Sequence, residues 1–375
     1  MKQPHILLVT TDQQRYDATS VTGPSFLRTP HYHQLCDQGV HFSRTYADCP
    51  LCVPSRTTIM TGKPAYDHGL TYNGRTGEVI DRESALPSRL NALGYQTAAI
   101  GKMHFEPQRL RHGFQEMILP DDYYREMTSS GSEFQPMRHG LGQNELTPGM
   151  ATVPETQTLT SWIAERCVDY IHYRRDPELP FFLWCSFSKP HPPLDPPEPY
   201  YSMYRDCDIP EPVQGDWSQT ENLPLAMRRH WERLGKDRLS PEVIREARAA
   251  YYGLITQIDF NLGRVLGALQ AADILKDTLI LYTSDHGEFL GDHQGCAKTF
   301  FNEASARVPF VLRLPPSWDH DHFGKTSEQL VTLADIYPTL LAAAGADAHS
   351  EQGGTNLMNA LEKDQSTRSH VLSIA

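Results

Sequence analysis

The sequence predicts an α/β protein with a mostly parallel central sheet that is flanked by helices. Short apolar runs recur along the chain, and segments with apolar residues at helical spacing lie between them. Such runs are typical of strands buried on both faces, and strands that alternate with helices indicate a covered parallel sheet. The chain has 375 residues, of which 39% are hydrophobic, so it can bury a large core.

Five apolar runs are the predicted strands, at residues 6–9, 97–100, 181–187, 279–282 and 308–312. The predicted helices cover residues 159–173, 241–269 and 327–344. Gly253 or Gly263 could break the second helix, and Gly345 is expected to end the third. Little periodicity is found in two long segments rich in Pro, Gly, Tyr and Met, residues 106–156 and 190–240. We expect these segments to be insertions that shape a pocket.

The overall charge argues against a general nucleic-acid-binding protein, because the net charge is −12 and such proteins carry basic patches. The seven cysteines are odd in number and scattered, which does not suggest a disulfide framework. No signal-peptide region and no membrane-spanning stretch is recognisable. A cytoplasmic protein with reduced thiols is therefore expected, although a chain whose signal had been removed would look the same.

Polar residues follow four of the predicted strands. They are Asp12 and Gln13, Lys102 and His104, Lys189 and His191, and Asp285 and His286. Ligands bind beyond the carboxyl ends of the strands in open parallel sheets. Each residue alone also has a structural explanation, as a helix cap or a turn residue, but four strand ends together predict a binding or catalytic site.

Residues 52–56 read Cys-Val-Pro-Ser-Arg and are followed by Thr61 and Gly62. If Pro54 opens a helix, Cys52 lies at the positive end of the helix dipole, where an anionic group is stabilised. Arg56 then follows one turn later and could orient that group and neutralise its charge. The alternative is a buried structural cysteine in a proline-containing turn.

The Cys-x-Pro-Ser-Arg string resembles the maturation motif of the type I sulfatases. In that family the cysteine is oxidised to Cα-formylglycine, an aldehyde whose hydrate is the nucleophile. Further segments are similar to the family's motifs in order and rough spacing over residues 5–345. They are residues 10–17 (first metal motif), 101–105, 188–193 and 284–288 (second metal motif), with Lys298 at the position of an active-site lysine.

The resemblance implies a divalent metal held by Asp12, Gln13, oxidised Cys52, Asp285 and His286. Oxygen-rich ligand sets suit Ca²⁺, the expected ion, or Mg²⁺ and Mn²⁺, and imidazole shifts the balance towards Mn²⁺ or Zn²⁺. Gln13 stands where a second Asp is usual, and His286 where an Asn is frequent. Both departures are similar to the choline-sulfatase and phosphonate-monoesterase branches, so they leave the metal and the preference for sulfate open.

The same resemblance, together with the negative charge expected to develop on the ester in the transition state, assigns roles to the other polar residues. Lys102 and Lys298 would neutralise charge on the ester in the transition state. His191 would protonate the leaving alkoxide, and His104 would take the proton from the second hydroxyl of the hydrate. Arg56 would orient the nucleophile.

The sequence therefore predicts hydrolysis of sulfate esters, with an anionic small molecule or a saccharide sulfate as substrate and a formylglycine-generating enzyme as maturation partner. One alternative is a phosphonate monoester or phosphodiester hydrolase that uses the same apparatus. The other is an unmatured, non-catalytic member that acts as a binding module.

The resemblance also implies two units, a catalytic domain over residues 1–345 and the start of a C-terminal subdomain over residues 346–375. Residues 367–373 are expected to form the first strand of that subdomain, after which the sequence stops. An unpaired strand would be an exposed edge. Part of the pocket would then be incomplete, or a second subunit would cover it in a homo-oligomer.

Overall fold

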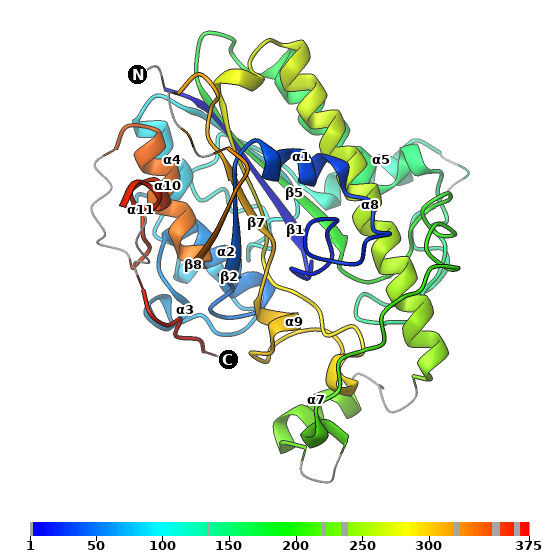
Figure 1. The fold of residues 1–375 in the computed structure, drawn as a ribbon. Helices are drawn as coiled ribbons and strands as arrows, with labels where there is room; N and C mark the ends of the chain where they lie inside the picture. The colour runs from blue at the N-terminus through cyan, green and yellow to red at the C-terminus, as the bar shows by residue number, and fades with distance from the viewer. Residues whose placement is uncertain are drawn as a thin grey trace.

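The computed structural model describes residues 3–131, 133, 135–219, 223–233, 239–318, 321, 323–346, 353–363 and 368–374. Within them, one eight-stranded sheet with the order β4-β3-β5-β1-β6-β7-β2-β8 forms the centre of the molecule (Figure 1). The strands are β1 (His5–Asp12), β2 (Val40–Tyr46), β3 (Gln96–Gly101), β4 (Glu116–Ile118), β5 (Phe181–Pro190), β6 (Thr278–Ser284), β7 (Phe310–Arg313) and β8 (Lys325–Thr332). All neighbouring pairs are parallel except those that β7 makes with β6 and β2.

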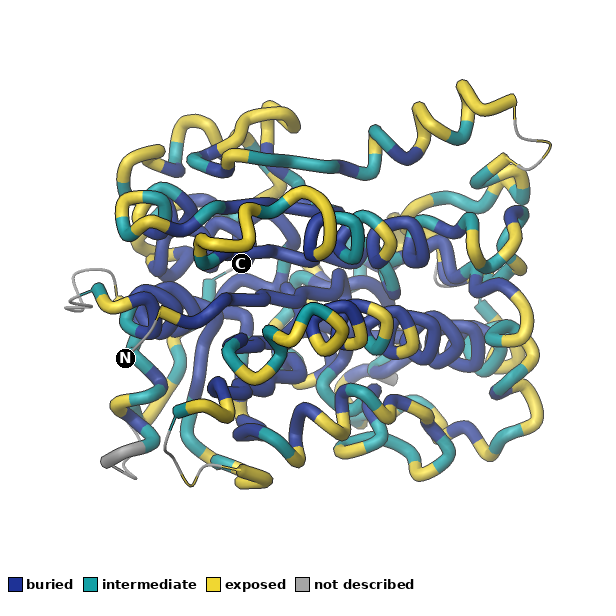
Figure 2. Tube along the Cα trace, turned by 90° about the horizontal axis from the view of Figure 1, so that it is seen from above, coloured by how far each residue is buried: buried dark blue, intermediate teal, exposed yellow. Residues whose placement is uncertain are grey.

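Helices cover both faces of the sheet, as the buried middle layer in Figure 2 shows. The α-helices are α1 (Pro30–Asp37), α2 (Cys52–Thr61), α3 (Ala65–His68), α4 (Leu86–Ala92), α5 (Pro120–Ser129), α6 (Leu159–Asp169), α7 (Leu225–Arg233), α8 (Pro241–Ala271), α9 (Glu303–Ala306), α10 (Ile336–Ala343) and α11 (Leu357–Lys363). Apolar residues of α2, α4 and α10 pack on one face, and those of α1, α6 and α8 pack on the other. None of the helices in these residues is long and apolar enough to cross a membrane.

Strand β1 divides the two hydrophobic cores, and each of its eight residues is buried. Successive side chains of a strand point to opposite faces of its sheet. Ile6 and Leu8 accordingly join the core under α2, α4 and α10, whereas Leu7 and Val9 join the core under α1, α6 and α8. This central position holds the end of β1, and therefore Asp12, in a fixed place.

The predicted fold class is confirmed. Four of the five predicted strands lie within observed strands, and the fifth, at residues 308–312, begins two residues before β7. Helix α8 is continuous through Gly253 and Gly263. The predicted helix at residues 327–344 is wrong in its first half, because residues up to Thr332 form the edge strand β8 and the helix begins at Ile336. Parallel pairing of β8 with β2 supplies the backbone hydrogen bonds there.

The strand predicted at residues 367–373 is not observed. Thr367 lies outside the described residues, and residues 368–374 form no regular structure. Side-chain contacts hold this segment instead. Arg368 binds the buried carboxylate of Asp335 at 2.6 Å, and Ser373 Oγ donates to the Asp48 carbonyl at 2.7 Å.

Candidate active site

The carboxyl ends of β1, β3, β5 and β6 meet at one edge of the sheet, and the predicted polar residues gather there. The register explains this arrangement, because Thr11 lies beside Ser284 and Gly101 lies beside Ser186 in the parallel ladders. Parallel neighbours end on the same side, as expected for a binding edge of an α/β sheet.

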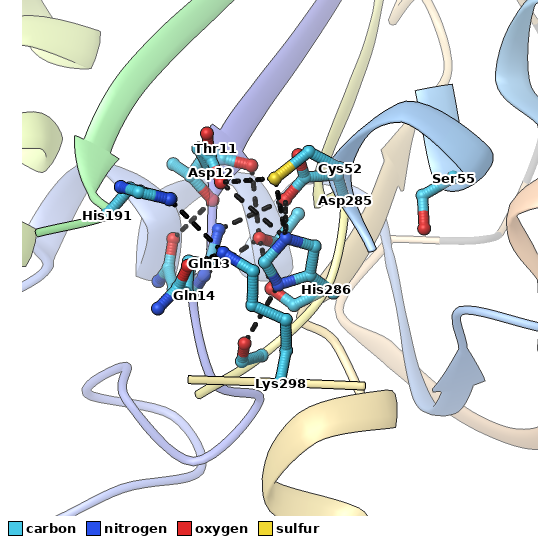
Figure 3. A network of polar contacts seen from close by, with 12 residues as sticks. Thr11, Asp12, Gln13, Gln14, Cys52, Ser55, His191, Asp285, His286 and Lys298 are labelled. Atoms are coloured by element: carbon cyan, nitrogen blue, oxygen red, sulfur yellow. Dashed lines mark hydrogen bonds and ion pairs between the residues drawn. The ribbon is translucent and has the colours of Figure 1, made fainter. Parts of the chain in front are cut away.

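Cys52 is the first residue of α2, so the helix begins two residues earlier than Pro54 predicts. Its side chain is 1% exposed and faces the end of β1 (Figure 3). The thiol sulfur lies 3.2 Å from His286 Nε2 and 3.7 Å from Asp12 Oδ1. The helix dipole favours an anionic group at this position. Helix α2 ends at Thr61 and is capped by Gly62, whose φ of 69° is left-handed.

Asp12, Cys52, Asp285 and His286 form a buried group whose ligand atoms all lie within 4.8 Å of one another. His286 Nδ1 lies 2.9 Å from the Gly287 carbonyl oxygen. A carbonyl oxygen only accepts, so Nδ1 carries a hydrogen and Nε2 is the ring nitrogen that faces the group. Two carboxylates and one imidazole that converge in this way could hold a divalent metal ion.

Two cations pair with the carboxylates of this group. Arg56 is 1% exposed, and its Nε donates to Asp285 Oδ2 at 2.9 Å. Its Nη1 donates to Ser186 Oγ at 2.9 Å and to the carbonyl of Lys102. Its Nη2 is buried and has no hydrogen-bond partner among the described residues. This nitrogen of Arg56 can therefore donate to a further oxygen atom. The second cation is Lys102, whose Nζ forms an ion pair with Asp12.

Lys298 contacts two uncharged groups of the site. Its Nζ donates to Gln13 Oε1 and lies 3.1 Å from His191 Nε2. His191 Nδ1 lies 2.8 Å from the Pro192 carbonyl oxygen and donates to it. His191 is therefore neutral and accepts from Lys298 through Nε2. Burial, together with the charges of Lys298 and Lys102, lowers the pKa of His191 well below its ordinary value.

The same charges act on Cys52. Burial and the Asp12 carboxylate raise the pKa of the thiol, but Lys298, Lys102 and His286 outweigh them and hold this pKa well below its ordinary value. The site therefore stabilises negative charge at residue 52 although the whole protein is acidic. A charge of this sign at this place suits a nucleophile or a metal ligand.

The match to known proteins covers almost the whole of this architecture. The family model described as Sulfatase matches residues 4–346. The chain belongs to the sulfatase family. It is 34% identical to an arylsulfatase from Clostridium perfringens, over 97% of this chain and 80% of that protein. It is 29% identical to a choline-sulfatase from Rhizobium meliloti, over 92% of this chain and 68% of that protein.

A solved structure supports the same conclusion for the fold. The phosphonate monoester hydrolase of Agrobacterium radiobacter superposes with a TM-score of 0.79 at 26% identity, over 96% of this chain and 77% of that chain. The resemblance that the motifs indicate is therefore confirmed, and this sulfatase has the expected alkaline-phosphatase-like fold.

A cavity of about 290 Å³ opens beside the charged groups of the sulfatase. Lys102, His104 and His191 line it, together with residues of α6 and α8 and of both predicted insertions, including Tyr123, Tyr124, Met137, Thr152 and Pro193. His104 has a φ of 59°, and its buried Nδ1 has no hydrogen-bond partner among the described residues. This nitrogen can therefore receive a hydrogen bond from a bound molecule.

Lys189 also lines the cavity, but its ammonium is held within the protein. It contacts Asp195 and donates to the Pro193 carbonyl at 2.6 Å. Asp195 in turn lies 3.1 Å from His139 Nε2, which joins the two insertions. Lys189 thus anchors the wall of the cavity.

Glu288 is a residue of the site that the sequence analysis did not select. It is 1% exposed, and its carboxylate accepts a hydrogen bond from the Gln13 amide. It lies two residues after His286 in the second metal motif, so its position offered a signal. Its partner across the sheet could not be read from one sequence, because the contact joins residues 275 positions apart.

Proposed function

We propose that this sulfatase hydrolyses sulfate esters with a formylglycine hydrate made from Cys52 as nucleophile. One observation carries the proposal. Cys52 opens a buried helix within 4.8 Å of the ligand atoms of Asp12, Asp285 and His286, and cationic side chains surround it. An unmodified thiolate that attacked the ester would keep the sulfuryl group as an S-sulfo adduct, whereas a hydrate has a second hydroxyl that can lose its proton and expel the sulfate.

The residues present fit a divalent metal ion. Asp12, Asp285, His286 and the oxidised Cys52 would hold it, with Gln13 as a further predicted ligand. A bound ion of this kind supplies positive charge that favours the ionised form of a neighbouring hydroxyl. Ca²⁺ remains the expected ion, with Mn²⁺, Mg²⁺ and Zn²⁺ as alternatives, because the set combines carboxylates with an imidazole.

Arg56 orients the nucleophile in this proposal. Asp285 and Ser186 fix its guanidinium, and the buried Nη2 that lacks a partner among the described residues is free to donate to a hydroxyl of residue 52. The attacking oxygen forms the bond to sulfur while the ester oxygen leaves on the opposite side. Lys102 and Lys298 stabilise the charge that develops on the sulfuryl oxygens and the leaving oxygen.

His191 is neutral in the free protein, so it must gain a proton before it can protonate the leaving alkoxide. Burial and the cations Lys298 and Lys102 keep it neutral, because they lower its pKa. A sulfate ester bound between those cations brings a negative charge that offsets them and favours protonation of His191. His104 then takes the proton from the second hydroxyl of the hydrate, and expulsion of sulfate restores the aldehyde.

The cavity beside the cations is proposed to receive the alcohol part of the substrate, which is a small molecule or a single saccharide unit at this volume. A maturation enzyme is the second proposed partner. Because Cys52 is 1% exposed within a fully buried helix, that enzyme must act before the chain has folded.

A phosphonate monoester or phosphodiester hydrolase is the second candidate. Gln13, His286 and the superposition on a phosphonate monoester hydrolase favour it. The test compares kcat/KM for 4-nitrophenyl sulfate, an aryl phenylphosphonate and a bis-aryl phosphate on one preparation of known formylglycine content. The proposal expects the sulfate to be the best substrate, and a higher value for either phosphorus ester would overturn it in favour of the second candidate.

A further inference from the structure

Glu288 is a buried acidic residue whose contacts point away from a purely structural role. Its Oε1 accepts from the backbone N–H of Leu290 at 3.0 Å. Its Oε2 accepts from the side-chain nitrogen of Gln13. A buried carboxylate is costly unless its oxygens accept hydrogen bonds in this way. The contact also fixes the partner, so its effect on the Gln13 amide has to be considered.

The two ends of the Gln13 amide have almost the same shape but opposite hydrogen-bonding character. A carboxylate only accepts, so Glu288 can face only the NH₂ end. The ammonium of Lys298 only donates, and it contacts the Gln13 carbonyl oxygen at the other end. Glu288 and Lys298 therefore select one of two otherwise similar orientations of this amide.

The backbone of Gln13 is held as firmly as its side chain. Its φ is 74°, which is left-handed and costly for this residue type. Its N–H donates to Asp285 Oδ1 at 3.0 Å, and its carbonyl accepts from the Tyr251 hydroxyl at 2.6 Å. With the main chain fixed, the remaining freedom of Gln13 is the orientation of its amide.

We propose that Glu288 is a positioning residue that turns the Gln13 carbonyl oxygen towards Lys298 and the ligand group of Asp12 and Asp285. Through Gln13 it sets the place of the Lys298 ammonium, which in turn donates to His191. The inference rests on the proposed function, because it gives Gln13 and Lys298 their roles at the reacting centre.

Replacing Glu288 with glutamine inverts the preference. The new side-chain amide keeps its oxygen for the Leu290 N–H and turns its NH₂ group to Gln13. The Gln13 carbonyl then faces position 288, and its NH₂ group faces the Lys298 ammonium, donor against donor. Gln13→Glu places two carboxylates against each other. The exchange Gln13→Glu/Glu288→Gln restores an acceptor towards Lys298 and a donor–acceptor pair with position 288.

The experiment compares the wild type, both single variants and the exchange variant. It measures kcat/KM for 4-nitrophenyl sulfate, Kd for Mn²⁺ by calorimetry on metal-free protein, and Tm. We expect E288Q to lose roughly 10- to 100-fold in kcat/KM and to bind Mn²⁺ more weakly. The exchange variant should recover most of both losses, which is strong coupling in a double-mutant cycle.

Losses that simply multiply in the exchange variant would overturn the proposal, as would an E288Q variant with wild-type kcat/KM and Kd. If E288Q does not fold, the test depends on the exchange variant alone. A Glu288 with only a structural role gives no reason for Gln13→Glu to restore folding, kcat/KM and Kd. A wild type that binds Mn²⁺ but hydrolyses no sulfate ester contradicts the proposed function, while the Kd values still test the role of Glu288.

Discussion

Replacing Lys298 with alanine should lower kcat/KM far more than loss of an ordinary surface lysine. The side chain is 6% exposed, and within the described residues its ammonium contacts two neutral groups, Gln13 Oε1 and His191 Nε2. Its charge is therefore available to a bound anion. A desolvated contact of this kind contributes about 3–4 kcal/mol to the transition state, so kcat/KM should fall by at least about 100-fold.

Lys276 provides the control. It precedes strand β6, whereas the site residues Asp285 and His286 follow the other end of the same strand. Its side chain is 57% exposed and pairs with Asp273 at 2.9 Å, and exposed surface pairs of this kind contribute little. Lys236, in a polar segment of the sequence, is a further control, but it lies outside the described residues. Lys102→Ala should also lose about 100-fold or more, with an added loss of metal because Lys102 pairs with Asp12.

The assay is steady-state kinetics with 4-nitrophenyl sulfate on folded variants whose formylglycine content has been measured. If Lys298→Ala and Lys102→Ala behave like Lys276→Ala, the strand-end residues are not the anion site, and the reasoning from their burial and contacts is refuted.

Three further predictions concern the nucleophile, the metal and the leaving group. Cys52→Ala should stay folded and lose multiple turnover, whereas Cys52→Ser should be esterified once and stall, as intact mass and a burst experiment would reveal. Asp285→Asn should lower metal content and activity together, since it removes an anionic ligand and the partner of Arg56; elemental analysis and re-addition of metal check this. His191→Gln should cost more with an alkyl sulfate than with 4-nitrophenyl sulfate, because a poor leaving group needs the proton more.

Each of these predictions has an outcome that contradicts it. Full turnover by Cys52→Ala would exclude residue 52 as the nucleophile. An enzyme that is fully active after exhaustive chelation, with no metal by elemental analysis, would exclude the metal site. Equal losses for both leaving groups in His191→Gln would assign the proton transfer to another residue.

The central part of the fold could be predicted because its signal is local. Strands β1, β5 and β6 are buried on both faces and read as continuous apolar runs. The edge strand β8 could not be recognised, because its first residues are exposed and polar and its pairing partner β2 lies about 280 residues earlier. The antiparallel direction of β7 also depends on long-range pairing.

The candidate site divides in the same way. Asp12, Cys52, Asp285 and His286 come from motifs with recognisable spacing, and the structure brings all four together. The roles of Lys189 and Glu288 depend instead on partners that only the folded chain supplies. Lys189 is occupied by Asp195, and Glu288 acts on Gln13 from another strand end. The catalytic and metal-binding roles assigned to all of the site residues stay predictions.

Mass spectrometry of the peptide that contains Cys52 shows directly whether this residue is converted to formylglycine. The protein should be produced together with a formylglycine-generating enzyme and also without it, and sulfatase activity should be measured on both preparations. We expect formylglycine at position 52 in the first preparation and activity in proportion to its content. Equal activity in a preparation whose residue 52 is entirely unmodified cysteine would exclude a formylglycine nucleophile.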